Sequence, residues 1–192
     1  CPRVRRCYDV TIRRMRRFAG KVALVVGGTS GIGLVTAQNF AREGAQVVIA
    51  GRDPEVGESA AGSVEGECRF IAADVQDGVS IAALMERIAT DLGGVDCAFN
   101  NAGWEGTAVN TAEIEESDWH RMIDIKLTGT WRCMKLQLEQ MLTRGGGAII
   151  NMVGNFGLVG FPAYASYCAA AAWSYGIDQG SSQGIRAREH TH

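Results

Sequence analysis

Residues 27–33 (GGTSGIG) form the segment best suited by composition to bind a charged ligand. Gly27 permits a tight turn, Gly31 lets the backbone approach an anion closely, and Gly33 allows a following helix to pack near the preceding strand. The free N–H groups and the positive dipole end of such a helix would face the anion. The pattern therefore predicts a cradle for a pyrophosphate group. A glycine-rich turn without a ligand is the alternative.

The flanking segments have the lengths and patterns needed to position this loop. Residues 21–26 form an apolar, β-branched run of strand length, and residues 34–43 are amphipathic. After Gly44, residues 46–50 form a second apolar run. Strand, glycine loop, helix and strand within about thirty residues make a βαβ unit, and this context favours the ligand-binding interpretation.

The Gly-x-x-x-Gly-x-Gly spacing resembles the classical short-chain dehydrogenase/reductase family, with Val26 where that family has threonine. Further motifs similar to those of the family follow in order. Asp74-Val75 closes the third apolar run, residues 100–103 (NNAG) close the fourth, and residues 145–151 (GGGAIIN) lead into the fifth.

This resemblance implies a nicotinamide dinucleotide cofactor and hydride transfer to or from a carbonyl or secondary alcohol. Its implied cofactor contacts are Gly27, Thr29, Ser30, Gly31, Ile32, Gly33, Arg52, Asp74, Val75, Asn101, Ala102 and Gly103. NAD-preferring folds carry an acid at the end of the second strand, where this chain has Gly51. Arg52 can neutralise a 2′-phosphate, so NADP(H) is favoured over NAD(H). Asp53 keeps NAD(H) open, and a solvated loop arginine is the other interpretation of Arg52.

In the family that this chain resembles, a tyrosine acts as general acid or base. It is assisted by a lysine four residues later, a serine thirteen residues earlier and an asparagine from the preceding long helix. Tyr167 matches the tyrosine, but Ala171, Gly154 and Lys126 occupy the other three positions. Loss of one preorganised donor to an oxyanion typically lowers the rate by about 10²–10³. Turnover is therefore expected to be absent or badly impaired.

Compensation for the missing lysine is one hypothesis. Lys126 lies on the helix that would face the lost lysine, so its ammonium could reach Tyr167. The alternative is that these positions drifted after selection relaxed.

Two other functions also stay open for the whole chain. One is a non-catalytic dinucleotide-binding or dimerising protein, and the other is a decayed fragment without function. The sequence does not identify a substrate.

The predicted fold class is α/β, a Rossmann-like doubly wound parallel sheet with strand order 3-2-1-4-5 and its last strands missing or incomplete. Residues 15–186 are expected to form one C-terminally truncated dinucleotide-binding domain. Residues 1–14 are expected to be a disordered arginine-rich leader, and residues 187–192 an unstructured tail. Residues 184–186 resemble the entry to a sixth strand, and residues 148–153 are expected to form an unprotected sheet edge.

Composition narrows the classes of partner. A formal net charge of −2 gives no reason to expect nucleic acid, and no apolar run is long enough to span a membrane. The six scattered cysteines favour a reducing, cytoplasmic compartment. No metal site is expected, since His190 and His192 are taken as part of a loose tail. The resemblance implies a homodimer or homotetramer through two long helices, at residues 118–141 and 163–175.

Overall fold

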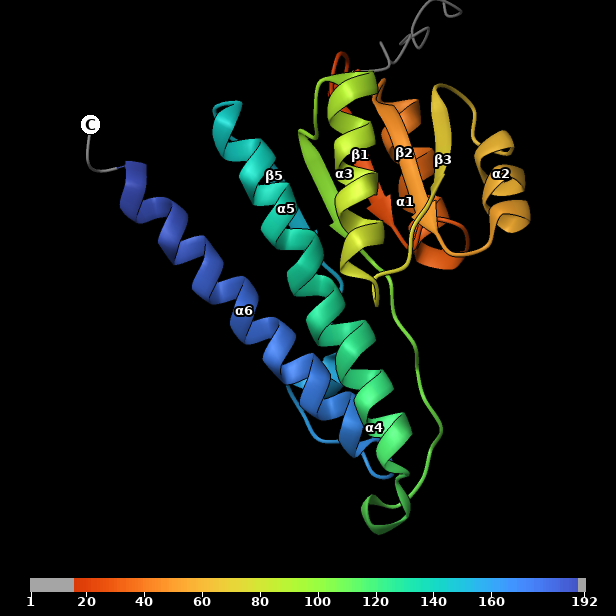
Figure 1. Ribbon diagram of the computed structural model, residues 1–192, viewed down its shortest axis with the longest axis vertical. Helices are drawn as coiled ribbons and strands as arrows, with labels where there is room; N and C mark the ends of the chain where they lie inside the picture. Colours follow the sequence, from red (N-terminus) through yellow and green to blue (C-terminus); the bar gives the residue numbers. More distant parts are fainter. Residues whose placement is uncertain (1–15, 190–192) are drawn as a thin grey trace, which may run out of the picture.

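The computed structural model describes residues 16–189. Five parallel strands form one sheet in the order β3-β2-β1-β4-β5, which confirms the predicted fold class and strand order (Figure 1). The strands are β1 (Val22–Val26), β2 (Gln46–Gly51), β3 (Cys68–Ala72), β4 (Cys97–Asn100) and β5 (Ala148–Asn151). Every residue of β1 is buried, because both faces of a central parallel strand are covered by helices.

Helices cover both faces of the sheet (Figure 1). Two helices, α1 (Gly31–Arg42) and α2 (Pro54–Gly62), cover one face. The other face carries α3 (Gly78–Leu92) and a long helix made of α4 (Glu116–Ile123), the π-helical segment η2 (Asp124–Thr128) and α5 (Gly129–Thr143). Two short 3₁₀ turns, η1 (Thr111–Glu113) and η3 (Asn155–Gly157), lie in the connections, and α6 (Ala165–Glu189) packs against η2, η3, α4 and α5.

The alternation of side chains along β1 divides the core into two clusters. Leu24 and Val26 face α3 and α5, where they join Ile81, Leu84 and Ile88. Ala23 and Val25 face α1 and α2 and pack with small residues of those helices. Small side chains on α1 and α2 bring these helices close to the sheet, so the loop that precedes α1 is held near the carboxyl ends of the strands.

Residues 184–186, which resemble the entry to a sixth strand in sequence, are helical. Helix α6 continues through this segment to Glu189 (Figure 1). The glycines at 176, 180 and 184 lower helix propensity, but no proline follows Pro162, so nothing blocks the backbone hydrogen bonds. Residues 187–189 of the expected tail are therefore helical. The proposed leader at residues 1–14, His190 and His192 lie outside the described residues.

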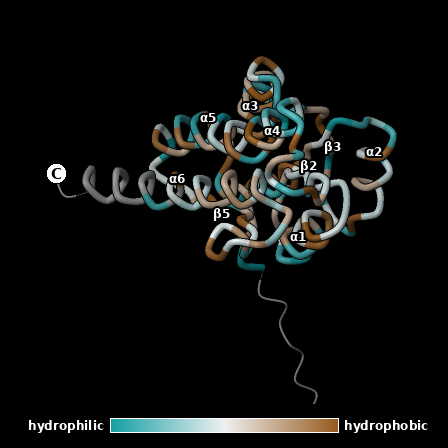
Figure 2. Tube along the Cα trace, turned by 90° about the horizontal axis from the view of Figure 1, so that it is seen from below, coloured by the Kyte–Doolittle hydropathy of each residue, from teal (hydrophilic) through white to brown (hydrophobic). Residues whose placement is uncertain are grey.

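At the opposite edge from β3, β5 pairs with β4 and ends the sheet of the described chain, as expected. Ile150 on this strand is 61% exposed. Figure 2 shows α6 at the end of the molecule that carries α5 and β5, away from α2 and β3. None of the helices within residues 16–189 combines the length and apolar character needed to cross a membrane.

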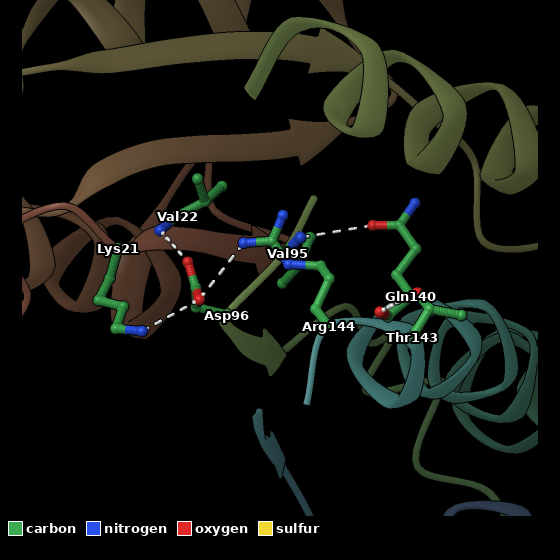
Figure 3. A network of polar contacts seen from close by, with 7 residues as sticks. All are labelled: Lys21, Val22, Val95, Asp96, Gln140, Thr143 and Arg144. Atoms are coloured by element: carbon green, nitrogen blue, oxygen red, sulfur yellow. Dashed lines mark hydrogen bonds and ion pairs between the residues drawn. The ribbon is translucent and has the colours of Figure 1, made fainter. Parts of the chain in front are cut away.

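Asp96 joins the amino-terminal ends of three strands (Figure 3). Its Oδ2 accepts a hydrogen bond from Val22 N at 2.8 Å, and its Oδ1 accepts from Lys21 Nζ at 3.2 Å and Arg144 Nη2 at 3.5 Å. Burial opposes the charge of this carboxylate, but the hydrogen bond from Val22 and the two cations outweigh that effect and lower the pKa of Asp96. The backbone of the same residue accepts from Ala148 N at 3.0 Å, so the group connects β1, β4 and β5.

This network predicts a pH-dependent contribution to stability. A carboxyl whose pKa is lowered by folding stabilises the fold above its unfolded pKa, about 3.9, and loses that contribution as pH falls through the folded pKa. Asp96→Asn should lower the free energy of unfolding by about 1–3 kcal/mol at pH 7. The gap to the native chain should shrink below about pH 4, as measured by urea unfolding at pH 7, 5 and 3. Asp91→Asn, which removes an exposed pair with Arg87 on α3, is the control and should change stability by about 0.5 kcal/mol or less. A gap that stays constant with pH would contradict the assignment.

Candidate functional site

The glycine loop between β1 and α1 is tied to the segment that follows β4. Gly27 has a φ of +75°, and a Cβ there would lie 2.7 Å from Ala102 N. Asn101 Nδ2 donates a hydrogen bond to Gly27 O at 3.0 Å. A Cβ at Gly33 would overlap Gly27 O and lie 2.9 Å from Asn101 Nδ2. Both glycines are required by close backbone approach, and the asparagine fixes the two loops to one another.

The amino terminus of α1 is open toward this loop. Ser30 precedes the helix in an extended conformation, and its side chain makes no capping hydrogen bond. The first turn contains no acidic residue. The first N–H groups of a helix have no intrahelical acceptors, so those of α1 are available to an anion, together with the positive end of its dipole.

A cavity of about 310 Å³ lies at the carboxyl ends of the strands and gathers most of the predicted cofactor contacts. It is lined by Val26, Gly27, Thr29, Ser30, Ala50, Gly51, Arg52, Ala73, Asp74, Val75, Gln76, Asn101, Ala102, Gly103, Trp104, Arg121 and Ile125. Gly31, Ile32 and Gly33 do not line it; Ile32 is 61% exposed and Gly33 serves the loop packing described above. Such a crevice outside the ends of parallel strands, where the strand order reverses, is where dinucleotides bind in doubly wound sheets. The glycine cradle and the uncapped helix fit the diphosphate of that ligand.

The end of β2 has little room for an acidic side chain. A Cβ at Gly51 would lie 2.8 Å from Thr29 Cγ2, so a larger residue there requires Thr29 to move. Asp53 caps α2: its Oδ1 accepts hydrogen bonds from Glu55 N at 2.9 Å and Val56 N at 3.1 Å. Between them, Arg52 is exposed and lines the cavity.

Trp104 and Arg121 are among the cavity-wall residues that were not predicted as site residues. The guanidinium of Arg121, from α4, stacks over the Trp104 ring at 4.4 Å from its centroid. The position of Trp104 directly after the NNAG motif was the available signal, because a residue next to a loop at the strand ends faces the same crevice. Nothing in the sequence around Arg121 indicated that α4 would reach the cavity.

The loop that carries Asp74 and Val75 is held from α5. Arg132 Nη1 donates to Val75 O at 3.1 Å and to Gln76 O at 2.8 Å, and also pairs with Asp124 Oδ1 at 2.9 Å. Asp74 Oδ1 accepts from Gln76 N at 3.0 Å, which tightens the turn. These bonds hold one wall of the cavity at a constant distance from the long helix.

A buried amide network fixes the end of β4. Asn100 and Gln137 exchange two hydrogen bonds, of 3.0 and 2.8 Å, and Asn100 Nδ2 also donates to Asn151 Oδ1 at 2.8 Å. Gln137 is fully buried and Asn100 is 4% exposed. Buried amides that satisfy one another tolerate little displacement. The network therefore holds α5, β4 and β5 in register next to Asn101. Of its members, Asn100 belongs to the NNAG motif that was recognised in the sequence.

Around Tyr167 the structure brings together Lys126 and Gly154. Lys126 Nζ donates a hydrogen bond to Tyr167 Oη at 3.1 Å and lies 4.4 Å from the ring centroid. A Cβ at Gly154 would overlap Tyr167 Oη and lie 2.9 Å from its Cε1. The tyrosine hydroxyl thus occupies the space that a side chain at residue 154 would need.

Ala171, at the position of the family's lysine, is fully buried. It packs against η3, where a Cβ at Gly157 would lie 3.0 Å from the Ala171 Cβ. Phe156 in the same turn contacts Tyr167 edge-on at 5.6 Å and stacks on Phe161 at 4.3 Å. The loop before α6 is consequently a packed aromatic cluster beside the tyrosine.

Burial makes Cys68 and Cys133 poor nucleophiles. Burial raises the pKa of Cys68 to about 11 and that of Cys133 to about 12. No described cysteine lines the cavity, and residues 16–189 contain no cluster of three or more metal-ligating side chains.

Comparison with known proteins agrees with this arrangement. The family model described as "short chain dehydrogenase" matches residues 21–176. A 3beta-hydroxysteroid dehydrogenase of Mediterraneibacter gnavus is 37% identical over 81% of this chain and 57% of its own length. An NADP-dependent (R)-specific alcohol dehydrogenase of Lentilactobacillus kefiri is 37% identical over 80% of this chain and 62% of its own length.

A solved structure of an NAD+-bound xylitol dehydrogenase superposes with a TM-score of 0.87 at 29% identity, covering 89% of this chain and 67% of the other. The chain spans less than two thirds of the length of the two curated relatives just described. The match to the family model and the shared strand order and glycine loop lead to one conclusion. This chain belongs to the short-chain dehydrogenase family, whose members bind a nicotinamide dinucleotide.

Proposed function

We propose that this protein binds NADP(H) and transfers hydride to or from a carbonyl or secondary alcohol, with slow turnover. The observation that carries the proposal is the cavity at the strand ends, with its glycine cradle and uncapped helix. Bound NADPH would supply the hydride. Tyr167 Oη is the proposed general acid in reduction and general base in oxidation.

The slow turnover is expected because residue 154 is a glycine and has no side chain. Glycine at this position offers no side-chain hydrogen bond to the reacting oxygen. A missing preorganised donor of this kind lowers the rate by about 10²–10³. The proposed rate is therefore low but dependent on Tyr167.

Preference for NADP(H) is supported by the end of β2. Thr29 fills the space beside Gly51, and Asp53 is already engaged in capping α2. Arg52 is then the charged side chain of that turn on the cavity wall, suited to a 2′-phosphate. The relatives include an NADP-dependent and an NAD-bound enzyme, so the comparison itself favours neither cofactor.

The test is thermal unfolding with NADPH and NADH in parallel. NADPH at a hundred times its Kd should stabilise the chain by about 2.7 kcal/mol, which raises the Tm by about 5–10 °C for a domain of this size. Arg52→Ala should weaken NADPH binding by about 10- to 100-fold and leave NADH binding nearly unchanged, because one charge-assisted contact is lost. Arg69→Ala, at an exposed arginine of β3 that does not line the cavity, is the matched control. An equal loss of NADPH and NADH affinity in Arg52→Ala would contradict the role of Arg52 in NADP(H) preference. A native chain whose Tm responds to neither nucleotide would contradict the proposed function.

A non-catalytic, self-associating protein is the second candidate, favoured by exposed tryptophans on the long helices. Trp131 on α5 is 48% exposed and Trp173 on α6 is 65% exposed, and both line an apolar hollow between the helices. We propose a homodimer or homotetramer through this surface, and light scattering of the same samples gives the mass. Free, partly or fully buried thiols support a cytoplasmic location as part of the proposal.

A further inference from the structure

The amine of Lys126 is the group next to Tyr167 that the proposed reaction has not yet used. We propose that Lys126 supplies, from the opposite helix, the ammonium that position 171 lacks, and that it acts through Tyr167 to stabilise the phenolate formed in each turnover. This inference rests on the proposed function, since it concerns the same tyrosine. The contact that carries it joins residues 41 positions apart, on η2 and α6.

The burial of Lys126 without a carboxylate partner among the described residues favours a negative charge on a neighbouring group. The residue is 7% exposed, and no carboxylate of the described chain lies within ion-pair distance of its Nζ. Asp124, on the same segment, is held instead by Arg132 at 2.9 Å. A buried ammonium without a counterion is costly, and it favours negative charge on the nearest oxygen. That oxygen is Tyr167 Oη, at 3.1 Å.

The substitutions at residues 154 and 171 are compatible with this contact. Because Gly154 has no side chain, Tyr167 Oη sits in the space beside its Cα. Ala171 is fully buried under η3, so no cation reaches the tyrosine from that position. The changes at 126, 154 and 171 therefore form one compatible arrangement, in which the phenol leans toward the lysine.

The backbone carbonyl of Lys126 fixes the residue to α5 and α6. Its carbonyl accepts hydrogen bonds from Thr130 Oγ1 at 2.7 Å and Ser174 Oγ at 3.1 Å, the latter from α6. The residue lies in a π-helical segment, a feature that often occurs at functional positions. Lys126 Nζ is also 3.7 Å from the Cβ position of Gly103, which lines the cofactor cavity. The pair thus adjoins the place where the nicotinamide would react.

The proton balance can be written for reduction of a ketone by NADPH. Hydride adds to the carbonyl carbon, and the Tyr167 Oη proton passes to the carbonyl oxygen, which gives the alcohol and a phenolate. The Lys126 ammonium gives a proton to that phenolate and becomes a neutral amine. A hydronium ion from solvent then restores the ammonium, so one solvent proton is consumed for each ketone reduced. In oxidation each transfer runs in reverse.

The experiment compares Lys126→Met, Lys126→Arg and Lys126→Ala with the native chain, using acetophenone, cyclohexanone, a linear 2-ketone and a ketose as carbonyl probes. NADPH affinity, measured by nucleotide fluorescence, should stay within about twofold, while kcat of Lys126→Met should fall by about 10²-fold with little change in KM. Lys126→Arg should retain part of the rate. Methylamine should raise the rate of Lys126→Ala and leave Tyr167→Phe inactive, which a purely structural role for the lysine does not predict.

A readout without turnover is the Tm of Lys126→Met, Tyr167→Phe and the double variant. Direct contact predicts that the double variant loses less than the sum of the single losses, because each single change strands the other group. Full kcat in Lys126→Met, no methylamine response, additive Tm losses, or no turnover of any probe by a native chain that binds NADPH would each overturn the inference. Absence of NADPH binding would instead overturn the proposed function beneath it.

Discussion

Gly33→Ala is expected to abolish NADPH binding and to destabilise the fold by about 3 kcal/mol, the upper end of the range for overpacked positions. The added Cβ would overlap Gly27 O and approach Asn101 Nδ2 to 2.9 Å. Neither Gly27 O nor Asn101 Nδ2 can be displaced at low energy cost. The first is backbone in the turn after β1, and the second holds that same turn through its 3.0 Å hydrogen bond. Opening this contact displaces the cradle and the amino terminus of α1 together.

Gly62→Ala is the matched control, since a Cβ at that position in α2 meets no atom within 4 Å. It should leave nucleotide binding unchanged and stabilise slightly, because alanine is the better helix former. Urea unfolding and NADPH fluorescence measure the two effects separately. A Gly33→Ala chain that binds NADPH with native affinity would show that the loop can open, and the cradle would lose its central argument.

The fold was predictable because its signals are local. The run from Lys21 to Gly33 contains a strand, a turn and a helix start within one short segment, and each part is dictated by side-chain branching or by glycine. Local signals did not show whether residues 184–186 would be helical. Residues 184–186 offered a weak local resemblance, while the absence of any proline after Pro162 allowed α6 to continue through them.

The cofactor wall and the Lys126–Tyr167 contact differ in how far they could be predicted from the sequence. The cofactor wall comes from strand ends, which a parallel sheet brings to one edge regardless of detail, so its residues could be named from motifs. The contact between Lys126 and Tyr167 depends on a π-helical turn and on the room left by Gly154. A register change of that kind has no sequence signature, so the contact could be advanced only as a hypothesis. Arg121 and the Asn100–Gln137 pair are also determined by helix packing over long sequence separations.

Gly154→Ser is expected to give no gain in rate, although it restores the family's serine. A donor at that position would raise the rate by about 10²–10³ if the tyrosine stayed in place. Here the Cβ would overlap Tyr167 Oη and lie 2.9 Å from Cε1 and 3.1 Å from Cζ. The ring must swing away, which breaks the 3.1 Å contact with Lys126 and disturbs the edge-on contact with Phe156. The displaced packing should also lower stability by about 1–3 kcal/mol.

Gly154→Ala separates the two effects of the serine, because it adds the same Cβ without the hydroxyl. Both variants should lose stability equally, and the serine variant should turn over faster than the alanine variant but no faster than the native chain. Steady-state rates with NADPH and urea unfolding of the three chains decide the matter. A Gly154→Ser rate about 10²-fold above native would mean that Tyr167 finds a second productive position without Lys126. The paired substitutions would then be independent changes, and the site would need only its serine to work.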